Sequence, residues 1–207
     1  DSSTSRGLGD VYKRQLRTIG VLKAAINHVL VENDLDLRNV FQGLKIKGAG
    51  SSKTDRLPVT DEQLATLLPV YATSPVPEAL FVTLTDTGAR LAEIVGLEAQ
   101  DLDLDKGCLN IRHNSIRRLK TKTSDRVIPL SRRAQELLRQ HQDGLSDTSP
   151  IFLQYARPRG SDAASAMLMK RLRTQVSDPK VTIHSLRHRI KDKLRNTGCS
   201  EDVSLAI

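Results

Sequence analysis

Apolar residues recur every three or four positions in the first part of the chain, which predicts an amphipathic helix. The apolar positions are Leu16, Ile19, Leu22, Ile26, Val29 and Leu30. The pattern ends near Asn33 and Asp34, residue types that favour helix ends. Such a helix must bury its apolar stripe against partners, so we interpret residues 16–47 as the tail of a helical domain.

Two polar stretches flank that helix. Residues 1–15 are rich in Ser, Gly and charge and lack periodicity. We interpret them as a translated adapter or cloning scar and expect them to be disordered. Residues 48–56 form a predicted Gly/Ser/Lys linker. They do not match a phosphate-binding loop, because Ser52 and Lys47 stand where that loop requires glycine.

A second domain is predicted for residues 57–207, and it begins with helices. Thr60 and Gln63 form a capping box ahead of an apolar run. Another helix is expected from about Glu78, ending at Gly88 as a C-terminal cap. A further helix follows Gly88 and places Arg90 and Glu93 one turn apart on its less apolar side.

The pattern changes to short alternating segments between Leu97 and Leu130, which predicts a small antiparallel sheet. Asp101–Asp105 is expected to enter a strand rather than bind calcium, because Lys106 and Arg112 occupy positions where a calcium loop needs Gly and Glu. Helical patterning returns after Ser131 and again over residues 163–176. The fold class is therefore α+β, mainly α-helical with a small antiparallel β-sheet.

The last helix is expected over residues 182–195, with Thr182 as a plausible N-cap. Its apolar stripe comprises Ile183, Leu186, Ile190 and Leu194, and a second side carries His184, Arg187 and His188. A helix start with an imidazole and a guanidinium three positions apart suits a phosphate or a carboxylate.

Charge narrows the class of partner. The chain carries a net charge of +8, and the segments 111–139 and 168–195 each hold nine basic and two acidic residues. Two basic segments on an otherwise acidic chain indicate a polyanion-binding surface. Aromatic content is only 3%, which disfavours proteins that stack single-stranded bases, so double-stranded DNA is the better candidate.

Cysteine and hydropathy add two expectations. Cys108 and Cys199 are too few for a zinc site or a disulfide framework, which indicates a reducing cytoplasm. No apolar run approaches the length of a membrane span, and no membrane partner is expected.

Three motifs stand in order in the second domain. They are Thr-Asp-Thr-Gly-Ala-Arg-Leu-Ala-Glu-Ile-Val-Gly-Leu at 85–97, Leu-Lys-Thr-Lys-Thr-Ser-Asp-Arg-Val-Ile-Pro-Leu at 119–130 and His-Ser-Leu-Arg-His at 184–188. Each motif alone is weak, but together they resemble the tyrosine recombinase, or phage integrase, family. Residues 57–207 resemble its catalytic domain, and residues 16–47 more weakly resemble the end of its DNA-binding core-binding domain.

The resemblance implies site-specific DNA recombination or integration, with metal-independent cleavage and rejoining through a 3′-phosphotyrosyl intermediate. By similarity, Arg90 and Arg187 would clamp the scissile phosphate, because a guanidinium fork matches two phosphate oxygens. Lys120 would protonate the departing 5′-oxygen, and Lys122 is close enough in sequence to be a rival.

The resemblance also assigns supporting roles. His184 would act as an assisting acid or base and contact the phosphate, with His188 as its partner and Glu93 orienting Arg90. It implies no metal and no small-molecule cofactor. The expected setting is a bacterial or phage-encoded mobile-element protein on cytoplasmic, nucleoid DNA, with the full-length protein self-associating there.

The family's nucleophilic tyrosine follows the His-x-x-Arg helix, whereas Tyr12, Tyr71 and Tyr155 all precede His184. We therefore expect a fragment, truncated at both ends and lacking the nucleophile, which does not complete recombination. The main alternative is a non-catalytic double-stranded DNA-binding module of the same fold. A type IB topoisomerase is a closer chemical rival, and a helical protein-interaction domain explains neither the basic segments nor the hairpin lysine.

Overall fold

The computed structural model describes residues 2–44, 56–114, 116–117 and 125–200, with side chains from Arg14 onward. The chain divides into two compact units, residues 1–55 and residues 56–207. The linker predicted at 48–56 and the rejected phosphate loop lie outside the described residues, apart from Arg56.

The first unit contains one long helix, α1 (Ser2–Glu32), which ends where the sequence pattern predicted. It begins well before Leu16, in the stretch expected to be disordered. Once nucleated, a helix propagates at little cost through residues of middling propensity, which a search for apolar periodicity does not detect. Among the described residues 33–44 that follow α1, Asn39 is buried. Its side-chain amide donates to the carbonyl of Lys23 and to Oδ1 of Asn27.

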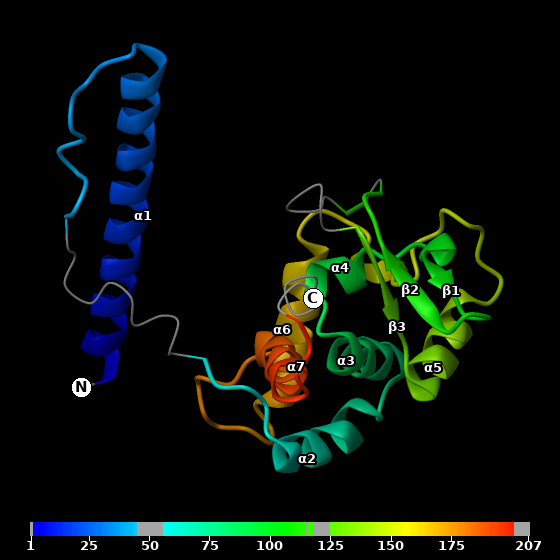
Figure 1. Ribbon diagram of the computed structural model, residues 1–207. Coiled ribbons are helices and arrows are strands. Elements are labelled where there is room, and N and C mark those ends of the chain that lie inside the picture. The colour runs from blue at the N-terminus through cyan, green and yellow to red at the C-terminus, as the bar shows by residue number, and fades with distance from the viewer. Residues whose placement is uncertain (1, 45–55, 115, 118–124, 201–207) are drawn as a thin grey trace. The chain divides into compact units, whose positions relative to one another are not determined.

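The second unit is mainly helical with one small sheet, as predicted. Its α-helices and strands are α2 (Asp61–Tyr71), α3 (Pro75–Thr87), α4 (Leu91–Val95), β1 (Leu102–Asp103), β2 (Cys108–Ile111), β3 (Arg126–Pro129), α5 (Arg132–Gln142), α6 (Gly160–Leu172) and α7 (His184–Asn196). Two short 3₁₀ turns, Ala99–Asp101 and Leu153–Tyr155, complete the described elements. Figure 1 shows α3 surrounded by α2, α5, α6 and α7.

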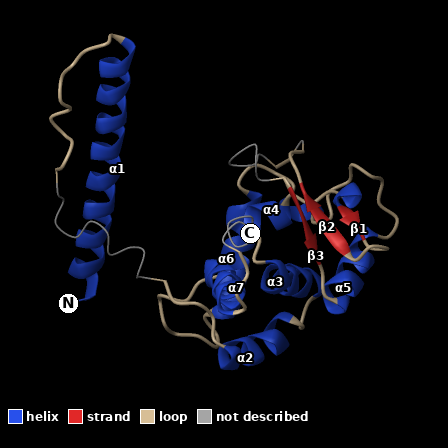
Figure 2. Ribbon diagram, viewed as in Figure 1, coloured by secondary structure: helices blue, strands red, loops and turns tan. Residues whose placement is uncertain are grey.

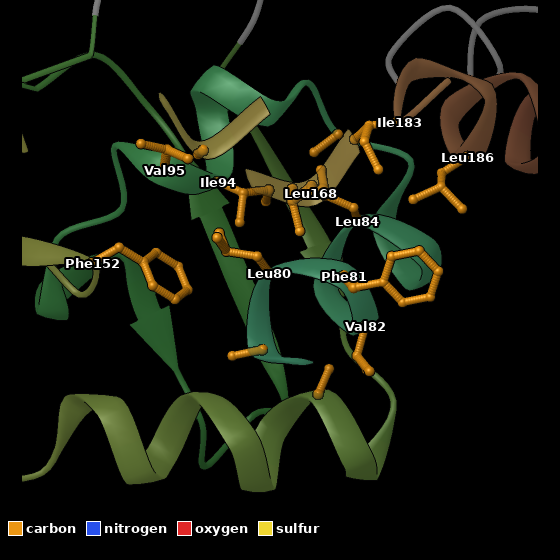
Figure 3. Packing of buried hydrophobic residues seen from close by; sticks show 14 of the residues in the cluster. Leu80, Phe81, Val82, Leu84, Ile94, Val95, Phe152, Leu168, Ile183 and Leu186 are labelled. Atoms are coloured by element: carbon orange, nitrogen blue, oxygen red, sulfur yellow. The ribbon is translucent and has the colours of Figure 1, made fainter. Parts of the chain in front are cut away.

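Helix α3 is the centre of this unit because its sequence is apolar on nearly every side. A helix that is hydrophobic all round is stable only when neighbours cover it. Leu80 and Phe81 are fully buried, and the Phe81 ring stacks on Tyr71 of α2 with centroids 3.8 Å apart. Figure 3 shows α3 side chains in one cluster with Leu168 of α6 and Leu186 of α7. The core therefore fixes where α7 lies.

The three strands form an antiparallel sheet in the order β1-β2-β3, which confirms the prediction for this region (Figure 2). Leu109 of β2 faces Leu102 and Ile128 on its two neighbours. Leu109 and Ile111 are fully buried while Cys108 and Asn110 are half-buried, so the alternation in the sequence matches the two faces of the sheet.

Several predicted helix signals are confirmed. Thr60 and Gln63 exchange both hydrogen bonds of the capping box, and the Ser131 hydroxyl accepts from the Ala134 amide at the start of α5. Gly88 ends α3 with φ +60, a conformation that favours glycine.

Two local expectations are corrected. Thr182 does not cap α7: its amide donates to the Ser185 hydroxyl, and its own buried hydroxyl has no hydrogen-bond partner among the described residues. The helix after Gly88 is only five residues long, and Glu93 is buried rather than on an outer side. The spacing of apolar residues predicts which side of a helix Glu93 occupies, but it gives no information about arginines on other elements that contact it.

No helix in the described part of the chain is long and apolar enough to cross a membrane.

Candidate phosphate-binding site

The site begins where α3 ends and α4 starts. Gly88 turns the chain, and Arg90 then occupies the N-cap position of α4 in extended conformation. The Arg90 amide and its Nη1 each donate to the Glu93 carboxylate at 2.8 Å. The Arg90 side chain remains 42% exposed, so its guanidinium is held at one end and open to solvent at the other.

Glu93 joins Arg90 to the sheet. Nη2 of Arg126, on β3, donates to the same carboxylate at 2.7 Å. Burial alone would raise the pKa of Glu93, but hydrogen bonds from Arg126 and from the Arg90 amide outweigh burial and lower it. Glu93, Arg90 and Arg126 are hereafter the Glu93 cluster. Glu93 thus contacts Arg90 within this cluster. Arg126 belongs to the motif at 119–130, but the sequence analysis assigned it no role.

Arg187 reaches this cluster from α7. Its side chain is buried, and its Nη1 donates to the Gly88 carbonyl at 2.8 Å across 99 residues of sequence. Burial lowers the pKa of Arg187 to about 10, and the neighbouring charges of Arg90 and Arg126 act in the same direction. The group stays protonated at neutral pH, so several guanidinium charges are held together at an energetic cost.

His184 and His188 lie one turn apart on the same side of α7. Their rings meet edge to face with centroids 4.9 Å apart. Partial burial lowers the pKa of His184 to about 4, assisted by His188 and by nearby arginines including Arg187. The His184 imidazole is therefore neutral at pH 7.

A second arginine–carboxylate group lies at the ends of two strands and contrasts with the first: Asp101 directly precedes β1, and Arg112 directly follows β2. Asp101 is fully buried and accepts from Arg112 Nε at 2.5 Å and from Arg117 Nη2 at 3.3 Å. Glu98 is also buried and lies 4.0 Å from Arg112. These four residues are hereafter the Asp101 cluster. Arg117 links the clusters, because its Nη1 donates to the backbone carbonyl of Glu93 at 2.9 Å.

The structure thus brings Arg90, His184 and Arg187 into electrostatic contact, with Glu93 and His188 beside them. Lys120 and Lys122 lie outside the described residues. Convergent cationic donors with a neutral imidazole suit an anion whose charge grows during reaction, such as a phosphodiester under attack. Among the described residues, no group of His, Cys, Asp and Glu is arranged to hold a metal ion.

Two tyrosines can be placed. Tyr71 is fully buried, and its hydroxyl donates to the Leu168 carbonyl at 2.6 Å; burial raises its pKa further above the ordinary value. Tyr155 is half-buried at a cavity of about 450 Å³ that Gly96, Arg117 and Arg159 also line. Arg90, Glu93, His184 and Arg187 do not line that cavity.

Sequence reasoning missed Arg126 and the Gly88 carbonyl. Arg126 stands 33 residues after Glu93, so no local spacing joins the two. The glycine was read as a helix terminator, and nothing in its identity shows that its carbonyl receives a guanidinium from α7.

Comparison with known families gives a match to the model of the phage integrase family over residues 59–204. A tyrosine recombinase XerA of Thermococcus kodakarensis is 30% identical over 145 residues, covering 68% of this chain and 49% of that protein. A tyrosine recombinase XerC of Roseiflexus castenholzii is 27% identical over 178 residues, covering 78% of this chain and 54% of that protein. The chain thus spans about half the length of these curated relatives.

Solved structures share the fold. The Tn1549 transposon integrase, solved in complex with circular intermediate DNA, superposes with a TM-score of 0.69 at 19% identity. That match covers 94% of this chain and 70% of the other. A crystal structure of a XerA recombinase gives a TM-score of 0.60 at 18% identity, covering 89% of this chain and 64% of the other.

Proposed function

This chain belongs to the phage integrase family, and the relatives compared above are tyrosine recombinases; we propose that it supplies the phosphate-activating part of a site-specific DNA recombinase. Its substrate is double-stranded DNA. The observation that carries the proposal is the convergence of Arg90, Arg187 and His184 at one place with Glu93 as the carboxylate that holds Arg90.

The proposed reaction is a transfer of the phosphodiester to a tyrosine. The tyrosine oxygen attacks phosphorus, the bond to the 5′-oxygen breaks, and the products are a 3′-phosphotyrosyl linkage and a 5′-hydroxyl. Negative charge grows on the non-bridging oxygens, where Arg90 and Arg187 stabilise it; each such donor contributes about 10²–10³ in rate by analogy with oxyanion holes.

Proton transfer falls to two further groups in this proposal. Lys120, or its rival Lys122, donates to the departing 5′-oxygen. His184 contacts the phosphate as a neutral imidazole and gains or loses a proton as charge develops. Glu93 and His188 touch no reacting atom: Glu93 positions Arg90, and His188 holds the ring of His184.

We propose that the nucleophilic tyrosine lies outside the 207 residues. Two observations support this: Tyr71 is fully buried with its hydroxyl bonded to the Leu168 carbonyl, and Tyr155 lines a cavity that the site residues do not share. The proposal also takes residues 16–47 as part of a core-binding domain. It places self-association on DNA in the longer protein.

The test uses a longer reading frame that extends beyond Ile207. Incubated with a nicked duplex carrying a recombination target, the longer protein should form a covalent protein–DNA adduct that survives denaturation. The adduct should disappear when the restored tyrosine becomes Phe and should fall by at least about 10²-fold in Arg187→Lys, because lysine cannot reproduce the two-pronged contact. Salt-sensitive duplex binding without any adduct would instead identify a non-catalytic DNA-binding module.

A further inference from the structure

Helix α7 carries five basic residues, and their ion pairing is uneven. Arg189 and Lys193 both pair with Asp61 at the start of α2, and Arg195 pairs with Asp192 within the helix. Arg187 and Lys191 have no carboxylate within 4.0 Å among the residues that the structure describes. These two residues lie one turn apart on α7.

Lys191 lies on the site side of α7. It follows Arg187 by four positions and His184 by seven, so all three belong to one face of the helix. Its side chain is half-buried. Burial lowers the pKa of Lys191, and repulsion from Arg187, Arg195, Arg90 and Arg126 lowers it further.

We propose that Lys191 is a further phosphate-binding residue, whose ammonium contacts a non-bridging oxygen of the same phosphate that Arg90 and Arg187 hold. This inference rests on the proposed function and deepens it. Lysine suits such a place because its ammonium is a compact charge with three donors on a flexible stem, and it needs no fixed fork geometry.

The electrostatic balance of the site supports the assignment. Arg90, Arg126, Arg187 and Lys191 carry four positive charges, and in the described part of the chain Glu93 is the carboxylate that pairs with Arg90 and Arg126. Holding like charges together is unfavourable, and half-burial removes part of the water that would screen them. A bound phosphate supplies the missing negative charge, so the arrangement destabilises the free protein and strengthens anion binding.

The experiment measures thermal unfolding of the full 207-residue chain with and without inorganic phosphate. The comparison solution is sodium chloride of the same ionic strength, because salt alone screens repulsion. A ligand that binds the folded state raises the melting temperature by mass action, so the phosphate-specific increase reports binding at the site. Titration calorimetry with phosphate gives the dissociation constant.

The variant is Lys191→Gln, which removes the charge and keeps most of the stem. We expect it to melt higher than wild type in chloride, because a repelled charge is gone. We expect the dissociation constant for phosphate to rise about tenfold, because the variant loses one charge-assisted hydrogen bond. Lys193→Gln is the matched control on the same helix, two positions along and paired with Asp61, and it should bind phosphate as wild type does.

Arg187→Gln separates failure of this inference from failure of the proposed function. If Arg187→Gln weakens phosphate binding and Lys191→Gln does not, the phosphate site stands and the role of Lys191 is overturned. If wild type shows no phosphate-specific stabilisation, or if both variants bind phosphate as wild type does, the phosphate site and the role of Lys191 are both overturned.

Discussion

The Glu93 and Asp101 clusters are built from the same residue types, arginines and carboxylates, but they differ in charge balance. The Asp101 cluster sets two arginines against two carboxylates, and Asp101 and Arg117 are almost completely buried. The Glu93 cluster sets Arg90 and Arg126 against one carboxylate, and α7 adds Arg187 and Lys191 beside it. The balanced cluster is suited to holding the fold together, whereas we propose that a bound phosphate completes the cluster with surplus positive charge.

The largest expected effect breaks the balanced cluster. Asp101→Asn leaves the Arg117 guanidinium buried without its carboxylate, and breaking a buried pair in this way costs about 3–5 kcal/mol. Urea unfolding should show that loss in the free energy of unfolding. Added phosphate should not restore it, because the arginine lies away from solvent; specific recovery with phosphate would contradict the structural role of this cluster.

Glu93→Gln makes the equivalent change in the other cluster. We expect the free energy of unfolding to fall by about 1.5–3 kcal/mol, since the glutamine amide keeps some of the hydrogen bonds but not the charge. Phosphate at the same ionic strength as a chloride control should recover more stability here than in Asp101→Asn. Equal recovery in the two variants would remove the distinction between the clusters.

Gly96→Ala tests how rigidly Arg117 is held. A methyl group at Gly96 would lie 2.9 Å from Cβ of Arg117 and 3.2 Å from the Ala92 carbonyl oxygen. Neither atom is the far end of a flexible side chain, so we expect a loss of about 1–3 kcal/mol in the free energy of unfolding. The control Gly20→Ala meets no atom within 4 Å and should not reproduce the loss.

The smallest expected effect concerns pH and the surplus-charge site. His184 has a pKa of about 4 in the folded protein against 6.5 for the free side chain, so the unfolded chain binds more protons between these values. Stability should therefore fall as pH drops from about 6.5 to about 4. In His184→Gln the fall in melting temperature over that range should be smaller, and an unchanged profile would contradict the lowered pKa.

The sequence predicted well wherever the information was local. The Thr60 capping box, the Gly88 terminator and the alternation around Leu109 each depend on residues a few positions apart, and the structure confirms all three. The resemblance to the recombinase family likewise rested on short motifs, and the family match confirms it.

The sequence could not predict contacts between residues that are far apart in the chain. The burial of Glu93 depends on Arg126, 33 residues later, and the burial of Arg187 depends on Gly88, 99 residues earlier. Thr182 was misread although its contacts are local. Threonine before a helix is a common cap, but here the Ser185 amide donates to the Thr182 carbonyl, and the Ser185 hydroxyl accepts from the Thr182 amide. Residue type sets what a side chain can bind, and tertiary packing decides what it does bind.

The bond from Arg187 to the Gly88 carbonyl also bears on the order of folding. It closes a loop of 99 residues, and contacts of such long sequence separation form slowly because chain entropy opposes them. Until α7 reaches α3, the Glu93 cluster lacks the guanidinium of Arg187 and the imidazole of His184. The proposed phosphate site is therefore complete only when the last described helix has docked, and a chain still folding carries separate basic segments.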